Sequence, residues 1–254
     1  MQTLQGQGPF CDGDAVLRRA CPWTPSIHAL LAALPEHGFT AAPVPIDFDA
    51  AWERVSYLPG ATGDLDSNSD MCAERALRSA ASILRHYHDC SALLLPRLAG
   101  ERLWQLPSRE PAEIICHGDF APYNVVLTDG EVTGIIDFEA AHPGPRSWDL
   151  AYAIYRWAPL SSDVDVEGLG KLDDQIRRAR IFADAYEMSV ADRRVVPETI
   201  VARLEALLAF MEHEASRGIE RYCRNLQDGH DRIYRHDIAY VQEWSLEITA
   251  GLVE

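Results

Sequence analysis

The sequence predicts an α+β protein with two lobes, a small N-terminal lobe rich in strands and a larger, mainly helical C-terminal lobe. Three observations predict this layout: strand-like patterns dominate residues 15–58, a polar, turn-rich stretch follows at 61–70, and helical patterns dominate from residue 147 onward. A chain of 254 residues is long enough to bury a core in both parts. We place the boundary beside the polar stretch, which gives an N-terminal lobe over 1–59 and a C-terminal lobe over 60–254.

The N-terminal lobe is predicted to hold three strands and one helix, and residues 1–14, rich in Gly and Gln, could form one further, frayed strand. AVLRR at 15–19 is one strand, and the stretches APVPIDFD and WERVSYLPG contain two more. In CPWTPSIHALLAALPEHGF we expect a helix with Thr24 as its N-cap, Pro25 at the first helical position and Gly38 as its stop signal.

The C-terminal lobe is predicted to begin with a long helix over about 70–88, followed by a shorter apolar segment near 93–98. Short strands come next, and Asp129-Gly130 is a pair that closes tight hairpins. The remaining predicted elements are strands over 113–116, 124–128 and 132–137 and helices over 147–157, 172–188, 191–217 and 231–249.

Charge and composition exclude several classes of partner. A formal net charge of −16 argues against nucleic acid or an anionic membrane as the main partner. The apolar runs are too short to cross a bilayer, and the first residues show no signal-peptide pattern, so we expect a cytoplasmic protein. Its six cysteines lack metal-binding spacing and are expected to be reduced thiols. The pattern leaves open whether the chain is a monomer or a homodimer.

Three polar residues within HGDFAPYN and IIDFEAA are candidate site residues. Asp119 and Asn124 bracket a loop, and Asp137 ends the hairpin that follows, so all three can meet at one end of a small sheet. An asparagine and an aspartate offer oxygen ligands suited to Mg²⁺ and a phosphate chain. A third carboxylate beside them can accept the proton of an attacking hydroxyl. The alternative is that these residues only form loops and turns, as we expect of Asp129.

HGDFAPYN resembles the H-G-D-x-x-x-x-N catalytic loop of the aminoglycoside phosphotransferase and choline kinase-like family. IIDFEAA resembles the family's I-D-[FW]-[ED] segment, PGPRSWDLAYA resembles the next one, and LRHYHD is similar to its L-R-x-x-H-D. The resemblance implies a protein kinase-like fold with a reduced N-terminal lobe. It also implies Asp119 as catalytic base, Asn124 and Asp137 as Mg²⁺ ligands, and Asp149 as the residue that steadies the loop. We expect His86, His88 and His117 to be structural.

The resemblance implies a nucleotide site as well. RVSYLPG resembles the strand and hinge that join the lobes, where backbone groups from Ser56 to Leu58 would bind a purine. The family's strand lysine is missing, because the chain has a single lysine, Lys171. Aligning V-x-R with V-x-K puts Arg18 at that position, from which a guanidinium can bind phosphate in a bidentate manner.

The N-terminal lobe departs from the family in two further ways. The helix that normally supplies a glutamate shows Ile27-His28 there and has no acidic residue in TPSIHALLAAL. LQGQGPFCDGD has glycines at 6, 8 and 13, but fewer than twenty residues precede Arg18, which leaves little room for a glycine-rich loop.

The leading hypothesis is a phosphotransferase that moves the γ-phosphoryl group of Mg-ATP or Mg-GTP to a hydroxyl of a small molecule. The family acts on aminoglycosides, macrolides, choline and homoserine. The acidic stretches SSDVDVEG and KLDDQ favour an amine-bearing acceptor such as an aminoglycoside, a reaction of antibiotic resistance, with Glu139 and Asp163 as candidate contacts.

Two alternatives remain. The missing lysine and glutamate favour a kinase-like binding protein with little or no turnover. A metal-dependent hydrolase that uses the same carboxylates is the third hypothesis.

Overall fold

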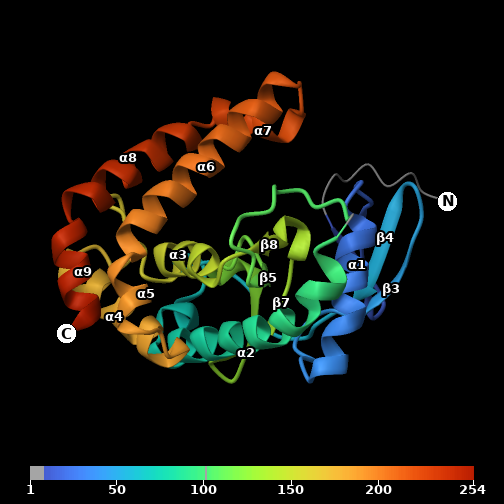
Figure 1. Cartoon of the computed structure of the whole chain (residues 1–254), viewed down its shortest axis with the longest axis horizontal. Helices are drawn as coiled ribbons and strands as arrows, with labels where there is room; N and C mark the ends of the chain where they lie inside the picture. The colour runs from blue at the N-terminus through green and yellow to red at the C-terminus, as the bar shows by residue number, and fades with distance from the viewer. Residues whose placement is uncertain (1–8, 101) are drawn as a thin grey trace.

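The structure is a computed structural model that describes residues 9–100 and 102–254, and it confirms the predicted α+β fold class. Figure 1 shows the N-terminal sheet with helix α1 at one end of the molecule and the C-terminal helices at the other end. Short strands β5 and β7 and helix α2 lie between them. The two glycines at positions 6 and 8 that were considered for a glycine-rich loop lie outside the described residues.

The N-terminal sheet is antiparallel and has the strand order β1-β2-β4-β3. Its strands are β1 (Phe10–Asp12), β2 (Ala15–Arg19), β3 (Pro45–Phe48) and β4 (Trp52–Ser56). Strand β2 has the predicted bounds. Its register with β4 places Arg18 directly opposite Glu53, and directly opposed residues on one face interact.

Helix α1 (Thr24–Ala33) packs its apolar side chains into the core beneath this sheet, and a short 3₁₀ turn carries the chain on to Gly38. The prediction of Thr24 as N-cap is wrong: the cap residue is Trp23, and Thr24 already belongs to the helix. The Thr24 hydroxyl instead accepts a hydrogen bond from the Cys21 N–H at 2.9 Å. Gly38, at φ +90°, ends the turn as predicted.

Two antiparallel strand pairs follow in the C-terminal part. β5 (Ile114–Cys116) pairs with β8 (His142–Gly144), and β6 (Val125–Thr128) pairs with β7 (Glu131–Ile135). The turn at Asp129-Gly130 closes the second pair with φ +53° and +77°, as the hairpin prediction requires. Strand β8 was not predicted.

The helical predictions differ from the structure mainly in how they divide the chain. The predicted long helix and the apolar segment after it form one helix, α2 (Glu74–Leu98), which contains Pro96 in its last turn. The other helices are α3 (Arg146–Trp157), α4 (Leu172–Tyr186), α5 (Val190–Arg194), α6 (Val196–Ser216), α7 (Glu220–Gln227), α8 (His230–Glu243) and α9 (Ser245–Val253). Within the described residues no helix is both long and apolar enough to cross a membrane.

The segment after β4 is bound to the C-terminal part. Ala61 and Leu127 exchange two backbone hydrogen bonds, of 2.9 and 2.8 Å. Gly60 makes this approach possible, because a Cβ there would lie 2.4 Å from Val126 and 2.6 Å from the Leu127 carbonyl oxygen. We propose that the lobes meet at this segment, near the predicted boundary.

Candidate active site

The structure brings the three residues of the predicted site together. The Asn124 side-chain amide donates hydrogen bonds of 2.9 Å to the main-chain carbonyl and to the carboxylate of Asp119. Asp137 lines the same cavity as Asn124 and follows directly after the hairpin. Its backbone is left-handed, with φ +59°, a conformation that aspartate tolerates better than most residues.

Asp119 is held from the opposite side by a tyrosine that sequence reasoning missed. The Tyr123 hydroxyl donates to its carboxylate at 2.9 Å, and the Tyr152 hydroxyl lies 3.4 Å from that of Tyr123. Burial raises the pKa of Asp119 above its ordinary value. A carboxylate with a raised pKa is a better proton acceptor for an alcohol than an ordinary one.

The loop that carries Asp119 is fixed by Asp149. The Asp149 carboxylate accepts hydrogen bonds from the N–H groups of His117, at 2.6 Å, and Gly118, at 2.8 Å. Gly118 cannot be replaced easily, because it has φ +83° and a Cβ there would lie 2.2 Å from the Ala140 carbonyl oxygen. The geometry therefore accounts for both the glycine of the HGD motif and the aspartate in α3.

His88 completes a fully buried chain of hydrogen bonds. Its Nε2 lies 3.0 Å from Asp149, and its Nδ1 lies 2.6 Å from the Tyr186 hydroxyl. Burial lowers the pKa of His88, so the neutral ring donates to Asp149 and accepts from Tyr186. Burial alone would raise the pKa of Asp149, but the hydrogen bond from His88 and those from the loop hold it below its ordinary value. His88 is structural here, and so is His117, whose Nε2 donates to the Ile136 carbonyl at 3.0 Å.

Arg18 of strand β2, the predicted phosphate-binding residue, lines the same cavity as Asn124 and Asp137. Its guanidinium lies 2.6 Å from Glu53 and 2.9 Å from Asp137. Burial would lower the pKa of Arg18, but these two carboxylates keep it raised. Glu53 also lies 3.0 Å from His28 of α1. The carboxylate that pairs with Arg18 thus comes from strand β4, and helix α1 contributes His28 behind it.

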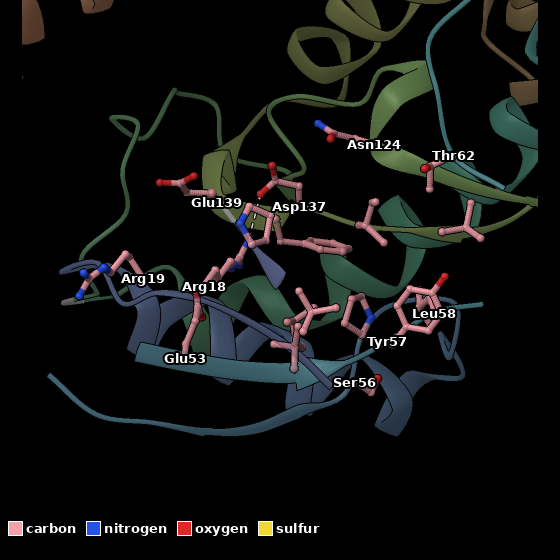
Figure 2. Close-up of a pocket in the computed structure, with 18 of the residues that line it drawn as sticks. Arg18, Arg19, Glu53, Ser56, Tyr57, Leu58, Thr62, Asn124, Asp137 and Glu139 are labelled. Carbon is pink, nitrogen blue, oxygen red and sulfur yellow. Dashed lines mark hydrogen bonds and ion pairs between the residues drawn. The ribbon is translucent and has the colours of Figure 1, made fainter. Parts of the chain in front are cut away.

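These side chains form one wall of a cavity of about 580 Å³ between the sheet and the catalytic loop. Figure 2 shows Arg18 directed at Asp137, with Ser56, Tyr57 and Leu58 at the other end of the cavity. The Ser56 and Tyr57 N–H groups donate hydrogen bonds to the main-chain carbonyls of Val44 and Asp14. Among the described residues, the Leu58 N–H has no acceptor.

The donor set fits Mg²⁺ bound together with phosphates. Both N–H groups of the Asn124 amide are used by Asp119, so its oxygen is available as a ligand. One Asp137 oxygen faces Arg18, and the other has no hydrogen-bond donor among the described residues. Within those residues no cluster of three or more His, Cys, Asp or Glu side chains is arranged for a metal. Magnesium is typically held by one or two protein oxygens plus substrate phosphates, which matches this pair.

A second cavity, of about 760 Å³, has Tyr123 in its lining. Its lining is acidic and aromatic, and Asp163, one of the predicted acceptor contacts, is part of it. Glu139, the other predicted contact, lies instead in the first cavity, 3.4 Å from Arg221. The residues that give the second cavity its character are Asp64, Asp66, Tyr123, Tyr155, Arg156, Asp163, Asp165, His230, Tyr234 and Asp237.

Asp237 is the most unusual residue of this second cavity, and sequence reasoning missed it. It is only 2% exposed, and one of its oxygens accepts a hydrogen bond from Tyr155. Its other oxygen has no hydrogen-bond partner among the described residues. Burial raises the pKa of Asp237. Buried carboxylate oxygens are rarely left without a donor, so this atom is suited to receive one from a ligand.

Part of this chain is similar to a known protein family. Residues 92–187, which include the catalytic loop, Asp137 and Asp149, match the model described as "Phosphotransferase enzyme family". The predicted family resemblance is confirmed.

The protein kinase-like fold of this chain is also found in solved structures. A choline/ethanolamine kinase family protein from Mesorhizobium loti is 14% identical, with 96% of this chain and 88% of that chain covered and a TM-score of 0.61. The amicoumacin kinase hAmiN, solved with AMP-PNP, Ca²⁺ and Ami, is 12% identical, with coverage of 87% and 84% and a TM-score of 0.57. At these identities the likeness concerns the fold.

Two curated relatives were also found by sequence. The trifolitoxin immunity protein of Rhizobium leguminosarum bv. trifolii is 28% identical over 213 residues, which cover 80% of this chain and 77% of that protein. Homoserine kinase of Neisseria meningitidis serogroup B is 37% identical over 73 residues, which cover 29% of this chain and 21% of that protein.

Proposed function

We propose that the chain transfers the γ-phosphoryl group of ATP or GTP, bound with magnesium, to a hydroxyl of a small molecule that carries a protonated amine. One observation carries this proposal: the Asp119 carboxylate is hydrogen-bonded to one lining residue of each cavity. Asn124, which lines the first cavity, and Tyr123, which lines the second, both donate hydrogen bonds to this carboxylate. A base placed between a nucleotide and a second small molecule is the arrangement that phosphoryl transfer requires.

The first cavity supports binding of the donor. The Leu58 N–H would bind the purine at the hinge end, and Arg18 would bind phosphate at the other end. Magnesium held by Asn124 and Asp137 would supply charge neutralisation at the phosphates. Arg18 would exchange Asp137 for phosphate oxygens while Glu53 keeps it in place.

The second cavity supports binding of the acceptor. Asp119 would accept the proton of the acceptor hydroxyl as the new oxygen–phosphorus bond forms, and the bond from the γ-phosphorus to the β-γ bridging oxygen breaks. Tyr123, which lines the second cavity, holds one oxygen of this carboxylate by a hydrogen bond of 2.9 Å. Asp237 would receive an ammonium group of the acceptor, because its second oxygen has no donor among the described residues and lies in an acidic, tyrosine-lined space.

Two of the relatives are named for an antibiotic-like or toxin-like compound, the amicoumacin kinase and the trifolitoxin immunity protein, and two are named for common metabolites. The immunity protein is the curated relative that matches most of this chain among those described above, over 80% of its length. We infer that the acceptor is an antibiotic-like or toxin-like compound rather than a common metabolite. Aminoglycosides are the first compounds to test, since they carry both hydroxyls and amines.

The decisive experiment measures nucleotide binding and ADP or GDP formation for the wild type, for Asp119→Asn and for the control Asp129→Asn. Asp129 is a turn residue of the same hairpin with positive φ, which asparagine tolerates. We expect Asp119→Asn to bind nucleotide normally and to lose about 1,000-fold in acceptor-dependent turnover. Asp129→Asn should behave as the wild type. Equal turnover in Asp119→Asn would contradict the proposed role, and phosphate release without an acceptor would favour the hydrolase.

A binding protein with little turnover is the second candidate, and the position of Arg18 favours it. Without a nucleotide, the charge of Arg18 is already paired with the carboxylates of Glu53 and Asp137, so Arg18 does not need a phosphate as its partner. The relative named as an immunity protein is not named as an enzyme. This candidate predicts magnesium-dependent nucleotide binding, or binding of the amine-bearing compound alone, with no product from any acceptor.

A further inference from the structure

Helix α7 reaches the nucleotide cavity from the acceptor side of the molecule. It joins α6 to α8, and Figure 1 shows it at the far tip of these two helices, which run side by side. Its residue Arg221 nevertheless lines the first cavity together with Arg18, Asp137 and Glu139. The neighbouring Tyr222 hydroxyl lies 3.3 Å from the Gln105 amide, which keeps α7 at this place.

The three arginines that line the cavity in the described structure differ in how firmly they are held. Arg18 is bound to two carboxylates at 2.6 and 2.9 Å. Arg19 is stacked over the Trp52 ring at 4.3 Å. Arg221 has one ion pair with described residues, a 3.4 Å contact with Glu139, and its side chain is 64% exposed. An exposed ion pair of this length contributes little, so Arg221 can exchange its partner at small cost.

The anion that would compete for Arg221 is the phosphate chain of the nucleotide. Glu139 lines the same cavity as Arg221 and Asp137, and its side chain is 27% exposed, so solvent reaches this carboxylate when Arg221 binds another anion. A triphosphate brings several negative charges to a wall that already holds Glu53, Asp137 and Glu139. Cations beyond Arg18 and a metal are therefore needed, and a guanidinium can bind two phosphate oxygens at once.

We propose that Arg221 binds the terminal phosphates of the nucleotide, leaving Glu139 to do so, and that α7 thereby forms a wall of the donor site. This inference rests on the proposed phosphotransferase function. It assigns a role in the donor site to a helix that belongs, in sequence and packing, to the acceptor side.

The test compares Arg221→Gln and Arg221→Lys with the control Arg224→Gln. Arg224 lies on the same helix, but it is paired with Glu220 at 2.8 Å and is absent from the cavity lining. Binding is measured by calorimetry with magnesium and a non-hydrolysable ATP or GTP analogue, and with adenosine or guanosine. Circular dichroism and melting temperature serve to show that each variant is folded.

We expect Arg221→Gln to bind the triphosphate analogue about 10-fold more weakly and the nucleoside as tightly as the wild type does. Arg221→Lys should regain part of the loss, and Arg224→Gln should match the wild type. If the wild type binds the analogue and Arg221→Gln binds it equally tightly, the role of Arg221 is refuted and the proposed function stands. If the wild type binds no nucleotide, both proposals fail.

Discussion

Each end of the candidate active site contains a buried histidine–carboxylate pair, and the two pairs do different work. His88 and Asp149 are 3.0 Å apart in the C-terminal part, and His28 and Glu53 are 3.0 Å apart in the N-terminal part. The Asp149 carboxylate also accepts hydrogen bonds from two backbone N–H groups. Glu53 instead holds the side chain of Arg18.

The difference teaches how each end of the site keeps its geometry. Both side chains of the first pair are completely buried, and Asp149 binds two backbone N–H groups of the loop that carries Asp119. The second pair binds a guanidinium whose other partner, Asp137, has a side chain that is 44% exposed. The loop is thus held by buried groups, whereas one of the two carboxylate partners of Arg18 is open to solvent.

The largest expected effect comes from breaking the first pair with Asp149→Asn. The asparagine amide would present N–H groups to the donors of the loop, and the buried network would lose its charge. We expect the free energy of unfolding to fall by about 3 to 5 kcal/mol, measured by urea denaturation at neutral pH. Asp89→Asn, which weakens the two partly exposed ion pairs of Asp89 with Arg85 and Arg146, should cost less than about 1 kcal/mol. Similar losses in both variants would show that Asp149 does not stabilise the fold specially.

A smaller loss in the free energy of unfolding is expected on acidification, and we expect it to arise at His142 in the C-terminal part. Burial lowers the pKa of His142, the partner of Cys116 in the β5–β8 pair, from 6.5 to about 4. The unfolded state therefore binds a proton at His142 more readily than the folded state does. The contribution of the neutral His142 to the free energy of unfolding is fully present above the unfolded pKa, and it is lost as pH falls toward the folded pKa. This loss amounts to about 2 kcal/mol by about pH 5, and burial of His88 acts in the same direction.

His142→Asn tests this acid dependence, because an asparagine amide can replace the ring contact with the Ala140 carbonyl. Urea denaturation from about pH 7 to about pH 5 should show a shallower decline in the variant, by about 2 kcal/mol. An unchanged slope would mean that His142 is protonated equally in both states.

The smallest effect is expected from breaking the second pair with Glu53→Gln. Arg18 would keep Asp137, so the free energy of unfolding should fall by only about 1 kcal/mol. Thermal and urea denaturation of the ligand-free protein measure this. Glu36→Gln, which removes an exposed ion pair with Arg97, is the control and should change nothing measurable. A loss as large as that of Asp149→Asn would mean that the two pairs do not differ as described.

The sequence predicted those parts of the site that lie close together along the chain. Asp119, Asn124 and Asp137 fall within one loop and one hairpin, and the turn at Asp129-Gly130 sets how the chain returns. Local spacing is sufficient for such a cluster. Asp149 was predicted through the family resemblance, and its contacts with the loop agree with that interpretation.

The residues that were missed meet only through tertiary structure. Glu53 faces Arg18 because two strands pair in one particular register, which no pattern within either strand reveals. Asp237 and Arg221 reach their cavities through the packing of α6, α7 and α8. Helix α7 itself was not predicted, since it is short, polar and flanked by Gly218 and Gly229. Its three apolar or aromatic side chains give a weak signal in a sequence window of that size.

The segment from α7 into α8 has a consequence for how such a protein would evolve. Within a short stretch of chain, Arg221 lines one cavity while His230, Tyr234 and Asp237 line the other. A mutation in α8 that is selected because it admits a new compound to the second cavity would lie in a helix directly connected to α7, which lines the proposed donor cavity. Changes in what the protein acts on should therefore be accompanied by changes in its affinity for nucleotide, and adaptation to a new compound would need compensating substitutions on the opposite side of the site.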